Sequence, residues 1–370
     1  MPYYADLGPH RLGDEWAADQ PARERAVARL LTLRQALGTD EGAPPPRNVR
    51  NLLLATWNIR EFDSPKWGPR LPESYAYIAE VIDRFDLVAL QEVREDLSAL
   101  KQLLFRLGEH WRFLVSDVTE GRAGNGERLA FLYDSRKVEF LGVAGELVLS
   151  PIKASSKTVP ATQIARTPLM AAFQVGWTKF VLGTVHILYG EKTAEPLARV
   201  EEIRQVARFL RRRTETPTEP YRNFIVLGDF NIFSSSDSTM NALIDEGGFT
   251  IPEEITHIPG TNVPQNRKYD QIAYRARQDR FEATGNAGVF DFYKYVFSVD
   301  ELTVYRPYIQ AYIDERHKQG LTTPKLPTTE AQWRTKYGDW RTYQMSDHLP
   351  LWAEFRIDFA DEYLTAIAGT

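Results

Sequence analysis

Polar residues that could do chemistry follow apolar runs at five places along the chain. At each place a carboxylate, an imidazole or an amide side chain comes directly after residues typical of a buried strand. The five segments are Trp57-Asn58-Ile59-Arg60, Gln91-Glu92-Val93-Arg94, Thr184-Val185-His186, Gly228-Asp229-Phe230-Asn231 and Ser346-Asp347-His348. Because sites in layered α/β proteins lie where strand ends meet, we expect these side chains to converge on one functional site.

The residue types in these segments suit hydrolysis assisted by a divalent metal ion. Glu92 and Asp347 offer hard carboxylate oxygens, and Asn58 adds a neutral carbonyl oxygen. That donor set suits Mg²⁺ or Mn²⁺ and has no preference for zinc. His348 follows Asp347 directly, so its imidazole could meet a phosphate or a water beside the metal.

Asp229 and Asn231 form a second candidate pair. Side chains two positions apart in an extended segment lie on the same face, so we expect this carboxylate and this amide to lie side by side. Together they could hold an attacking water and a phosphoryl oxygen. The sequence lacks the residues that would indicate a serine esterase, a zincin, a P-loop protein or an enzyme with a cysteine nucleophile. The chain contains no Gly-x-Ser-x-Gly, His-Glu-x-x-His or Gly-x-x-x-x-Gly-Lys motif and no cysteine.

Composition and charge set wider bounds. A chain of 370 residues suggests two domains or one large one, and 43% hydrophobic with 26% charged residues excludes a largely disordered protein. The net charge of −5 argues against a general polycation that coats nucleic acid, although it leaves room for a local basic groove. No apolar run reaches the ~18 residues that a membrane span needs, and the N-terminus lacks a secretory signal pattern. We therefore expect a cytoplasmic protein.

Short apolar runs alternate with helical patterns from Leu52 onward, which indicates a sheet covered on both faces by helices. The middle of the chain reads more like an antiparallel meander. The expected strands are Leu52–Trp57, Leu87–Leu90, Leu129–Tyr133, Val138–Leu141, Glu146–Leu149, Leu169–Val175, Lys179–Val185, Phe224–Leu227, Gln271–Tyr274 and Leu351–Ile357. The expected helices are Pro72–Phe85, Asp96–Leu107, Pro196–Arg213 and Ser236–Glu246.

Two segments stand apart from this alternation. Residues 1–50 predict a helical extension followed by a Pro-rich linker, with Val27, Leu30, Leu31 and Leu37 at helical spacing. We favour a helix that packs on the body over one that binds a partner. An insert at about 298–343 mixes aromatic residues with Lys and Arg. A small helical lobe whose aromatic side chains fill its own core is favoured over a surface that stacks bases or sugars.

Eight motifs, in this order, resemble those of the endonuclease/exonuclease/phosphatase superfamily and are most similar to its deoxyribonuclease I branch. They are ATWNIREF, LQEVRED, ERLAFLYDSRKV, ARTPLMAAF, GTVHI, LGDFNIF, KYDQIAY and SDHLPLW. The resemblance runs from about Leu52 to Ile357 and leaves out the first fifty residues and most of Ser298–Tyr343. It implies an α/β (α+β) fold, a four-layer sandwich of two packed mixed β-sheets flanked by helices, in a catalytic domain at 51–360. It also implies hydrolysis of phosphate esters with Mg²⁺, or with Mn²⁺ in its place.

The resemblance further implies a role for each site residue. Glu92 resembles the principal metal ligand, with Asn58 and Asp347 near the metal. His348 resembles the histidine that contacts the scissile phosphate, and Asp270 resembles the aspartate that orients it. His186 resembles the second active-site histidine, and Glu127 resembles its carboxylate partner. Asp229 resembles the water-activating carboxylate, and Asn231 resembles the phosphate-contacting amide.

Further positions concern the binding of substrate phosphates. Arg60, Arg94 and Arg166 match arginines that hold backbone phosphates in the nuclease branch, and the planar guanidinium fork suits that task. For Arg94 an ordinary surface ion pair is an equal alternative. The nuclease branch has an aromatic residue where this chain has Gly124-Asn125-Gly126. Asn125 either donates to a phosphate or lies in a plain hairpin turn, and we favour the turn.

The leading hypothesis is a divalent-metal-dependent phosphodiester hydrolase that acts as a DNA endonuclease by in-line attack of an activated water. The alternative is a phosphatase or phosphodiesterase of a small substrate, such as a nucleotide, an inositol phosphate or a phospholipid headgroup. A non-catalytic binding scaffold is the third hypothesis. The arginine matches favour a nucleic acid, DNA rather than RNA, because several phosphate contacts have no use on a small ester. The number of metals, the oligomeric state and the roles of the N-terminal helix and the insert stay open.

Overall fold

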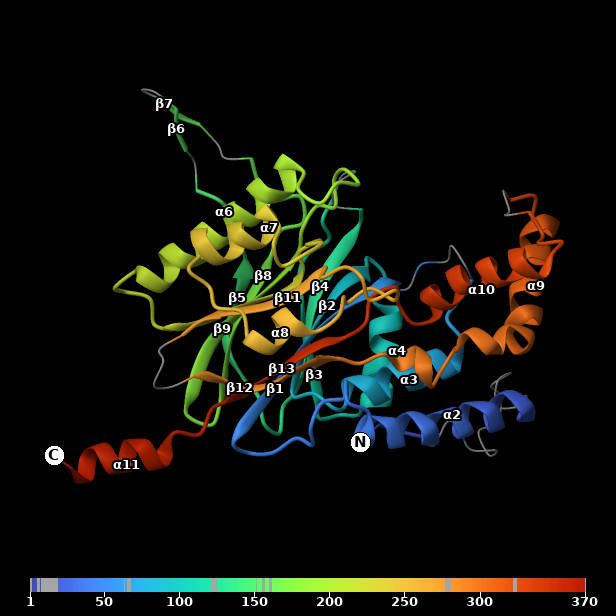
Figure 1. Ribbon diagram of the computed structural model, residues 1–370, viewed down its shortest axis with the longest axis horizontal. Helices are drawn as coiled ribbons and strands as arrows, with labels where there is room; N and C mark the ends of the chain where they lie inside the picture. The colour runs from blue at the N-terminus through green and yellow to red at the C-terminus, as the bar shows by residue number, and fades with distance from the viewer. Residues whose placement is uncertain are drawn as a thin grey trace.

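The computed structural model describes residues 2–4, 7, 19–62, 64, 68–120, 125–150, 152–154, 157–159, 162–276, 281–321 and 325–369. Within these residues the long strands form two mixed sheets that pack face to face (Figure 1). The six-stranded sheet has the order β12 (Glu282–Val289), β13 (Leu351–Arg356), β1 (Asn51–Phe62), β2 (Leu87–Arg94), β4 (Glu127–Asp134) and β3 (Trp111–Val115). The five-stranded sheet has the order β11 (Asp270–Arg275), β10 (Asn223–Asp229), β9 (Thr178–His186), β8 (Leu169–Val175) and β5 (Glu139–Glu146).

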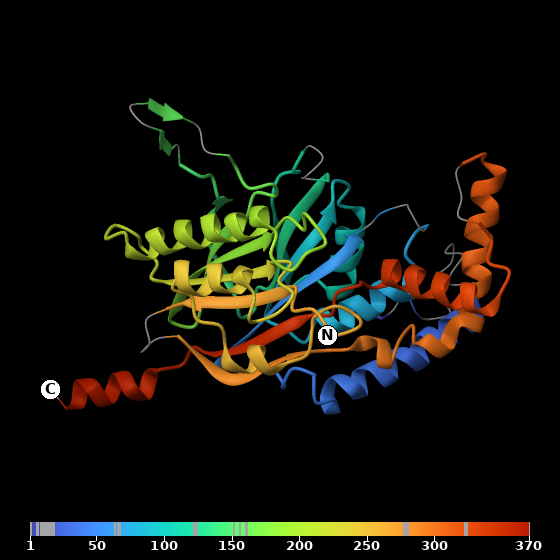
Figure 2. The same ribbon diagram turned by 45° about the horizontal axis from the view of Figure 1, so that its top comes forward.

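Helices cover the outer faces of both sheets, which confirms the predicted four-layer sandwich (Figures 1 and 2). Over the six-stranded sheet lie α3 (Pro72–Ile82) and α4 (Ser98–Leu107). Over the five-stranded sheet lie α6 (Leu197–Glu215), α7 (Ser238–Asn241) and the π-helical turn η2 (Ala242–Glu246). The central strands are buried on both sides, as their continuous apolar runs require. In the described part of the chain no helix combines the length and the apolar character that crossing a bilayer needs.

The remaining elements lie at the periphery. They are the short hairpin β6 (Ile152–Ala154) and β7 (Lys157–Val159), the helices α8 (Glu253–His257), α9 (Leu302–Lys318), α10 (Glu330–Gln344) and α11 (Ala360–Ala368), and the 3₁₀ turns η3 (Phe292–Lys294) and η4 (Val299–Glu301). The terminal helix α11 projects from the body and contributes no buried residue (Figure 1).

The strand prediction needs one correction in the meander. The expected strands Val138–Leu141 and Glu146–Leu149 are a single strand, β5, that ends at Glu146. Its register against β8 shifts between Phe140 and Ala144, and Leu149 donates its backbone N–H to the side chain of Gln163 at 2.8 Å instead of to a neighbouring strand. Strand β3 (Trp111–Val115), the hairpin strands at 152–154 and 157–159, and β12 are not among the expected strands. In β12 (EATGNAGV) the sequence contains no apolar run that would indicate a strand.

The expected N-terminal helix is present, and it buries two of the four apolar residues expected on its packed face, Leu30 and Leu37. It is α2 (Gln20–Thr39), and its N-cap Asp19 accepts from the backbone N–H of Ala22 at 3.1 Å. Val27 and Leu31 are 40% and 64% exposed, so they lie outside the packed face. The buried side chains are Ala22, Ala26, Leu30, Leu33, Ala36 and Leu37. Ion pairs to α3 reinforce this packing on the body. Residues 1, 5, 6 and 8–18 of the predicted extension lie outside the described residues.

The aromatic side chains of the insert pack against one another. The rings of Tyr305 and Tyr337 stack at 6.0 Å between centroids, and Phe297 lies 4.8 Å from Tyr305. Trp340 completes the group at 5.4 Å from Tyr305, and all four rings are buried. Rings that fill a core in this way cannot stack on bases at the surface. Residues 322–324 of the insert lie outside the described part.

Candidate active site

Strand register brings three predicted site residues into one row across the five-stranded sheet. Asp229 ends β10 and lies opposite His186 of the parallel strand β9 and opposite Asp270 of the antiparallel strand β11. All three side chains are buried. The parallel strands β9 and β10 end at the edge of the sheet where the antiparallel strand β11 begins. The row places two carboxylates and one imidazole within reach of one another.

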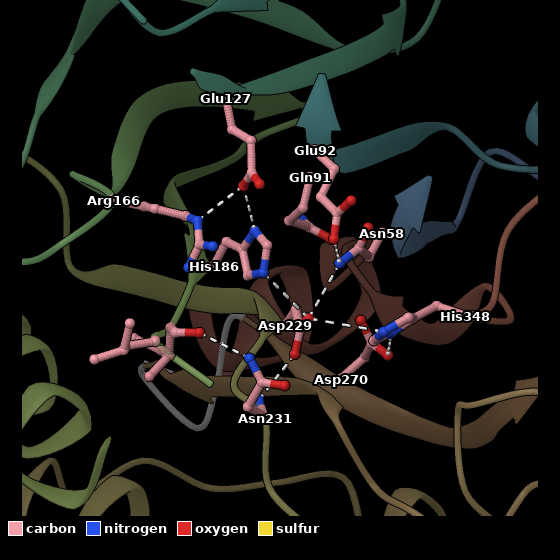
Figure 3. A network of polar contacts seen from close by, with 12 residues as sticks. Asn58, Gln91, Glu92, Glu127, Arg166, His186, Asp229, Asn231, Asp270 and His348 are labelled. Atoms are coloured by element: carbon pink, nitrogen blue, oxygen red, sulfur yellow. Dashed lines mark hydrogen bonds and ion pairs between the residues drawn. The ribbon is translucent and has the colours of Figure 1, made fainter. Parts of the chain in front are cut away.

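The six-stranded sheet contributes Asn58 and Glu92 from neighbouring strands. The Asn58 amide donates to Glu92 Oε1 at 2.9 Å and to Asp229 Oδ2 at 3.1 Å, so it joins the two sheets (Figure 3). Glu92 lies at an irregularity in the pairing of β2 with β4 and has a φ of +61°, which is unusual for a residue with a side chain. Such bulges re-aim side chains, and here Glu92 Oε2 accepts from the backbone N–H of Glu61 at 2.7 Å.

The first of two histidine–carboxylate pairs joins His186 to Glu127, which begins β4. His186 Nδ1 lies 2.9 Å from Glu127 Oε2, and its Nε2 faces Asp229 Oδ2 at 3.5 Å. Glu127 is also held by Arg166 Nε at 2.8 Å and by the amide of Asn125 at 2.7 Å. Burial alone would raise the pKa of Glu127, but His186 and Arg166 lower it to about 2. Burial would lower the pKa of His186, and the bond to Glu127 outweighs this and raises it.

The second pair joins His348 to Asp270, and it approaches Asp229 from the other side (Figure 3). His348 Nδ1 lies 2.8 Å from Asp270 Oδ2, and its Nε2 lies 3.8 Å from Asp229 Oδ2. The hydroxyl of Thr261 donates to Asp270 at 2.6 Å. Burial alone would lower the pKa of His348, but the charges of Asp270 and Asp229 raise it well above its usual range. The surroundings therefore favour the protonated form of both imidazoles.

The expectation that Asp229 and Asn231 share one face of an extended segment is wrong. Strand β10 ends at Asp229, and Asn231 has a left-handed φ of +54°. The chain turns so that the backbone N–H of Asn231 donates to Asp229 Oδ1 at 2.8 Å. The Asn231 amide donates to the carbonyl of Ile187 at 2.8 Å. The two residues remain neighbours, and the hydrogen bond from the backbone of Asn231 holds the Asp229 carboxylate in place.

Comparison with known proteins identifies the family. The model of the Endonuclease/Exonuclease/phosphatase family matches residues 55–341. The chain belongs to this family. Its members are hydrolases, so the chain is an enzyme that acts on phosphoester bonds. The matched residues include both sheets apart from β13 and β1's first residues, and they end before Asp347 and His348.

Two curated relatives are nucleases by name. The chain is 31% identical over 218 residues to a deoxyribonuclease of Thioalkalivibrio sp. (strain K90mix), which is 56% of this chain and 55% of the relative. It is 32% identical over 124 residues to Deoxyribonuclease-1 of Oryctolagus cuniculus, which is 32% of this chain and 40% of the relative. The chain thus spans about half the length, or less, of these curated relatives.

Two solved structures share the family fold. The catalytic domain of human Nocturnin with bound sulfate superposes with a TM-score of 0.52 at 14% identity, covering 83% of this chain and 95% of that one. D. rerio TDP2 complexed with a single-strand DNA product has a TM-score of 0.50 at 14% identity, covering 83% and 99%. At this identity the likeness concerns the fold alone.

The residues around Glu92 fit a divalent cation. Asn58 Oδ1 is buried and has no hydrogen-bond partner among the described residues, and a buried carbonyl oxygen without a donor is typical of a cation ligand. Carboxylate or imidazole atoms of Glu92, Glu127 and His186 lie within 4.8 Å of one another. Burial raises the pKa of Glu92, and the charges of Glu127 and Asp347 add to this effect against that of His186. A bound cation would relieve that repulsion.

Asp347 and the three predicted phosphate-binding arginines have different surroundings. Asp347 is 44% exposed and lies 3.7 Å from Arg60 Nε, outside the two close groups of possible ligands. Arg94 donates to the backbone carbonyl of Asn125 at 2.9 Å, and within the described residues it forms no ion pair. Arg166 is engaged with Glu127. Asn125 has a turn conformation with φ +58° and donates to Glu127, as the favoured turn interpretation requires; Gly124 lies outside the described residues.

Sequence reasoning does not assign the supporting roles of several residues near the site. Thr261 orients Asp270, and nothing in their spacing links them. Tyr269 lies against His348 with 5.5 Å between ring centroids, and its place beside Asp270 in KYDQIAY could have drawn attention to it. Gln91 donates to Thr184 at 2.9 Å and joins the two sheets behind the site. Gln91 and Thr184 belong to the strand-end segments, but nothing in the sequence indicates that they contact each other.

Proposed function

We propose that the chain is a divalent-metal-dependent DNA endonuclease that cuts phosphodiester bonds by in-line attack of an activated water. One observation carries the proposal. Two imidazoles, each paired with a buried carboxylate, turn their Nε2 atoms toward the same carboxylate oxygen, Asp229 Oδ2, at 3.5 and 3.8 Å. Protonated donors on both sides of a carboxylate suit a reaction in which an anion is attacked by water.

The metal would be held by Glu92, Asn58 and Asp347, and Mg²⁺ is the ion that this oxygen set suits. When bound, such an ion withdraws charge from the phosphoryl oxygens. Asn58 also links Glu92 to Asp229 through its two hydrogen bonds. The metal ligands and the water-activating group are thereby held in a fixed relation.

The side chains of the site would divide the remaining work. Asp229 would orient the attacking water and accept its proton, while the bond from the backbone of Asn231 fixes its orientation. His348 and His186 would donate hydrogen bonds to the phosphoryl oxygens, because their raised pKa values favour the protonated form. Asp270 and Glu127 would hold the two rings, each through Nδ1, so that Nε2 faces the substrate.

The choice of DNA is supported by two further observations. Both curated relatives are deoxyribonucleases by name. Arg60 and Arg94 lie near the ends of β1 and β2, beside the metal ligands on the same strands, where they could contact phosphates flanking the scissile one.

The test is incubation of the protein with supercoiled plasmid DNA, single-stranded RNA, inositol phosphates and phospholipids, each with Mg²⁺ or with EDTA. We expect nicking and linearisation of the plasmid that EDTA abolishes. Glu92→Gln should raise the Mg²⁺ concentration for half-maximal cleavage by about 10- to 100-fold, with Glu95→Gln on the same segment as a control. Turnover of a small ester without DNA cleavage would overturn the DNA proposal. Metal-independent cleavage would overturn the mechanism.

A further inference from the structure

Helix α10 of the aromatic insert reaches the edge of the candidate site through Arg60. The helix contacts β1, and its last turns lie beside the end of that strand (Figure 2). Arg60 Nη1 donates a hydrogen bond to Thr342 and lies 3.3 Å from Asp339 Oδ1. The guanidinium carbon lies 4.0 Å from the centre of the Tyr343 ring. Three side chains of α10 thus contact the guanidinium of Arg60, which lies on the same strand, β1, as the proposed metal ligand Asn58.

Two carboxylates lie close to Arg60, and one of them, Asp339, also interacts electrostatically with Lys336 of the same helix. Arg60 Nε lies 3.7 Å from Asp347 Oδ2, so one guanidinium faces two carboxylates. Arg60 is 23% exposed, while Asp339 and Asp347 are 42% and 44% exposed. The group is therefore open to solvent and to a substrate. Burial would lower the pKa of Arg60, but Asp347, Tyr343, Asp339 and Glu92 raise it.

Asp347 and Asp339 would have different roles in a complex with a metal ion and a substrate. Asp347 is a candidate metal ligand, so a bound cation would share its charge. Asp339 lies on helix α10 of the insert and is not among the residues proposed to hold the metal. Once a cation is bound, Asp339 is the carboxylate left to face Arg60 and to face any anion that approaches it.

We propose that Asp339 is a specificity-determining residue that competes with a substrate phosphate for Arg60. The inference rests on the proposed function, because it takes the anion to be a backbone phosphate of DNA. A phosphate that binds the guanidinium fork must displace Asp339 and must approach its negative charge. The insert would thereby weaken binding at one flanking phosphate and leave the reacting groups alone. Asp339 would act on affinity and not on the chemical step.

The experiment compares Asp339→Asn with Asp314→Asn. Asp314 lies on α9 of the same lobe, is exposed and accepts from Gln310 at 2.9 Å, so this control removes the same charge away from Arg60. Binding to a fluorescent DNA duplex is measured by anisotropy over a series of NaCl concentrations at one fixed Mg²⁺ concentration, with His348→Gln in every protein compared so that cleavage is slow. We expect Asp339→Asn to bind about three- to five-fold more tightly, the range of an exposed ion pair. The slope of log K against log salt should steepen by about 0.9 for one added phosphate contact. In cleavage, KM should fall and kcat should stay unchanged.

The same change in an Arg60→Gln background separates competition from a general charge effect. We expect the gain in affinity to disappear there, because the contested guanidinium is gone. Equal affinity and slope for Asp339→Asn and Asp314→Asn would overturn the proposal, and so would a gain that persists without Arg60. If the unaltered protein binds no DNA, both this proposal and the DNA proposal fail. If it binds and cleaves DNA but Asp339→Asn changes nothing, the inference alone fails.

Discussion

The two histidine–carboxylate pairs have similar geometry but differ in the number of positively charged side chains that contact the carboxylate. Each crosses from one sheet to the other, since His186 of β9 meets Glu127 of β4 and His348, just before β13, meets Asp270 of β11. Glu127 is shared by His186, Arg166 and Asn125, so two cations surround one carboxylate. The second pair has a single cation.

This difference predicts which pair is less sensitive to the loss of its imidazole. Asp270 meets His348 and the neutral hydroxyl of Thr261, and none of its contacts among the described residues is a second cation. When the imidazole of the first pair is removed, Arg166 still offers positive charge beside Glu127. When the imidazole of the second pair is removed, Asp270 is left buried without the charge that balances it, whereas Asp229 keeps its contact with His186. We therefore expect the second pair to be the more sensitive.

The largest expected effect is on the imidazoles. His348→Gln should lower kcat for DNA cleavage about 10³-fold, and His186→Gln about 10²-fold, because removal of a charged or proton-transferring group costs amounts of this order. Steady-state kinetics with saturating Mg²⁺ measure both, and His257→Gln in the short helix α8 serves as the control. Equal losses in the two variants would break the comparison.

A smaller effect is expected from the carboxylates that hold the rings. Asp270→Asn should lower kcat about 100-fold, while Glu127→Gln should lower it about 10-fold, since partners that orient a site group contribute 10- to 100-fold. Thermal melting in EDTA checks that each variant is folded. A greater loss in Glu127→Gln would assign the leading role to the first pair.

The positions of most site residues could be predicted because they follow from strand endings. Apolar runs show where β1, β2, β9, β10 and β13 lie, and polar residues at the ends of such strands must come close together once the sheets pack. The same logic could not assign their contacts. The register that sets Asp229 opposite both His186 and Asp270 depends on hydrogen bonds between distant strands, which no local pattern records.

Other features were beyond a local reading for stated physical reasons. The left-handed turn at Asn231 replaces the expected extended segment, and it is stabilised by bonds to Asp229 and Ile187 that depend on tertiary structure. Strand β12 is an edge strand with little apolar content, so the usual signal is missing. The grip of α10 on Arg60 joins positions 279 residues apart. Only the folded chain brings these groups together.

The smallest expected effect concerns stability in acid, and it distinguishes the pairs in a different way. The folded pKa of Glu127, about 2, lies below its unfolded value of 4.5. The stability that this shift contributes is therefore fully present above pH 4.5 and is lost as the pH falls toward 2. Urea unfolding in EDTA should show Glu127→Gln to be less stable than the unaltered protein by roughly 2 kcal/mol at pH 6, with the gap closing toward pH 2.5. The raised pKa of His348 acts with the opposite sign, because its contribution is complete below pH 6.5 and is lost only as the pH rises through the folded value. A gap that stays constant in acid would mean that Arg166 and His186 do not hold Glu127 ionised in the folded protein.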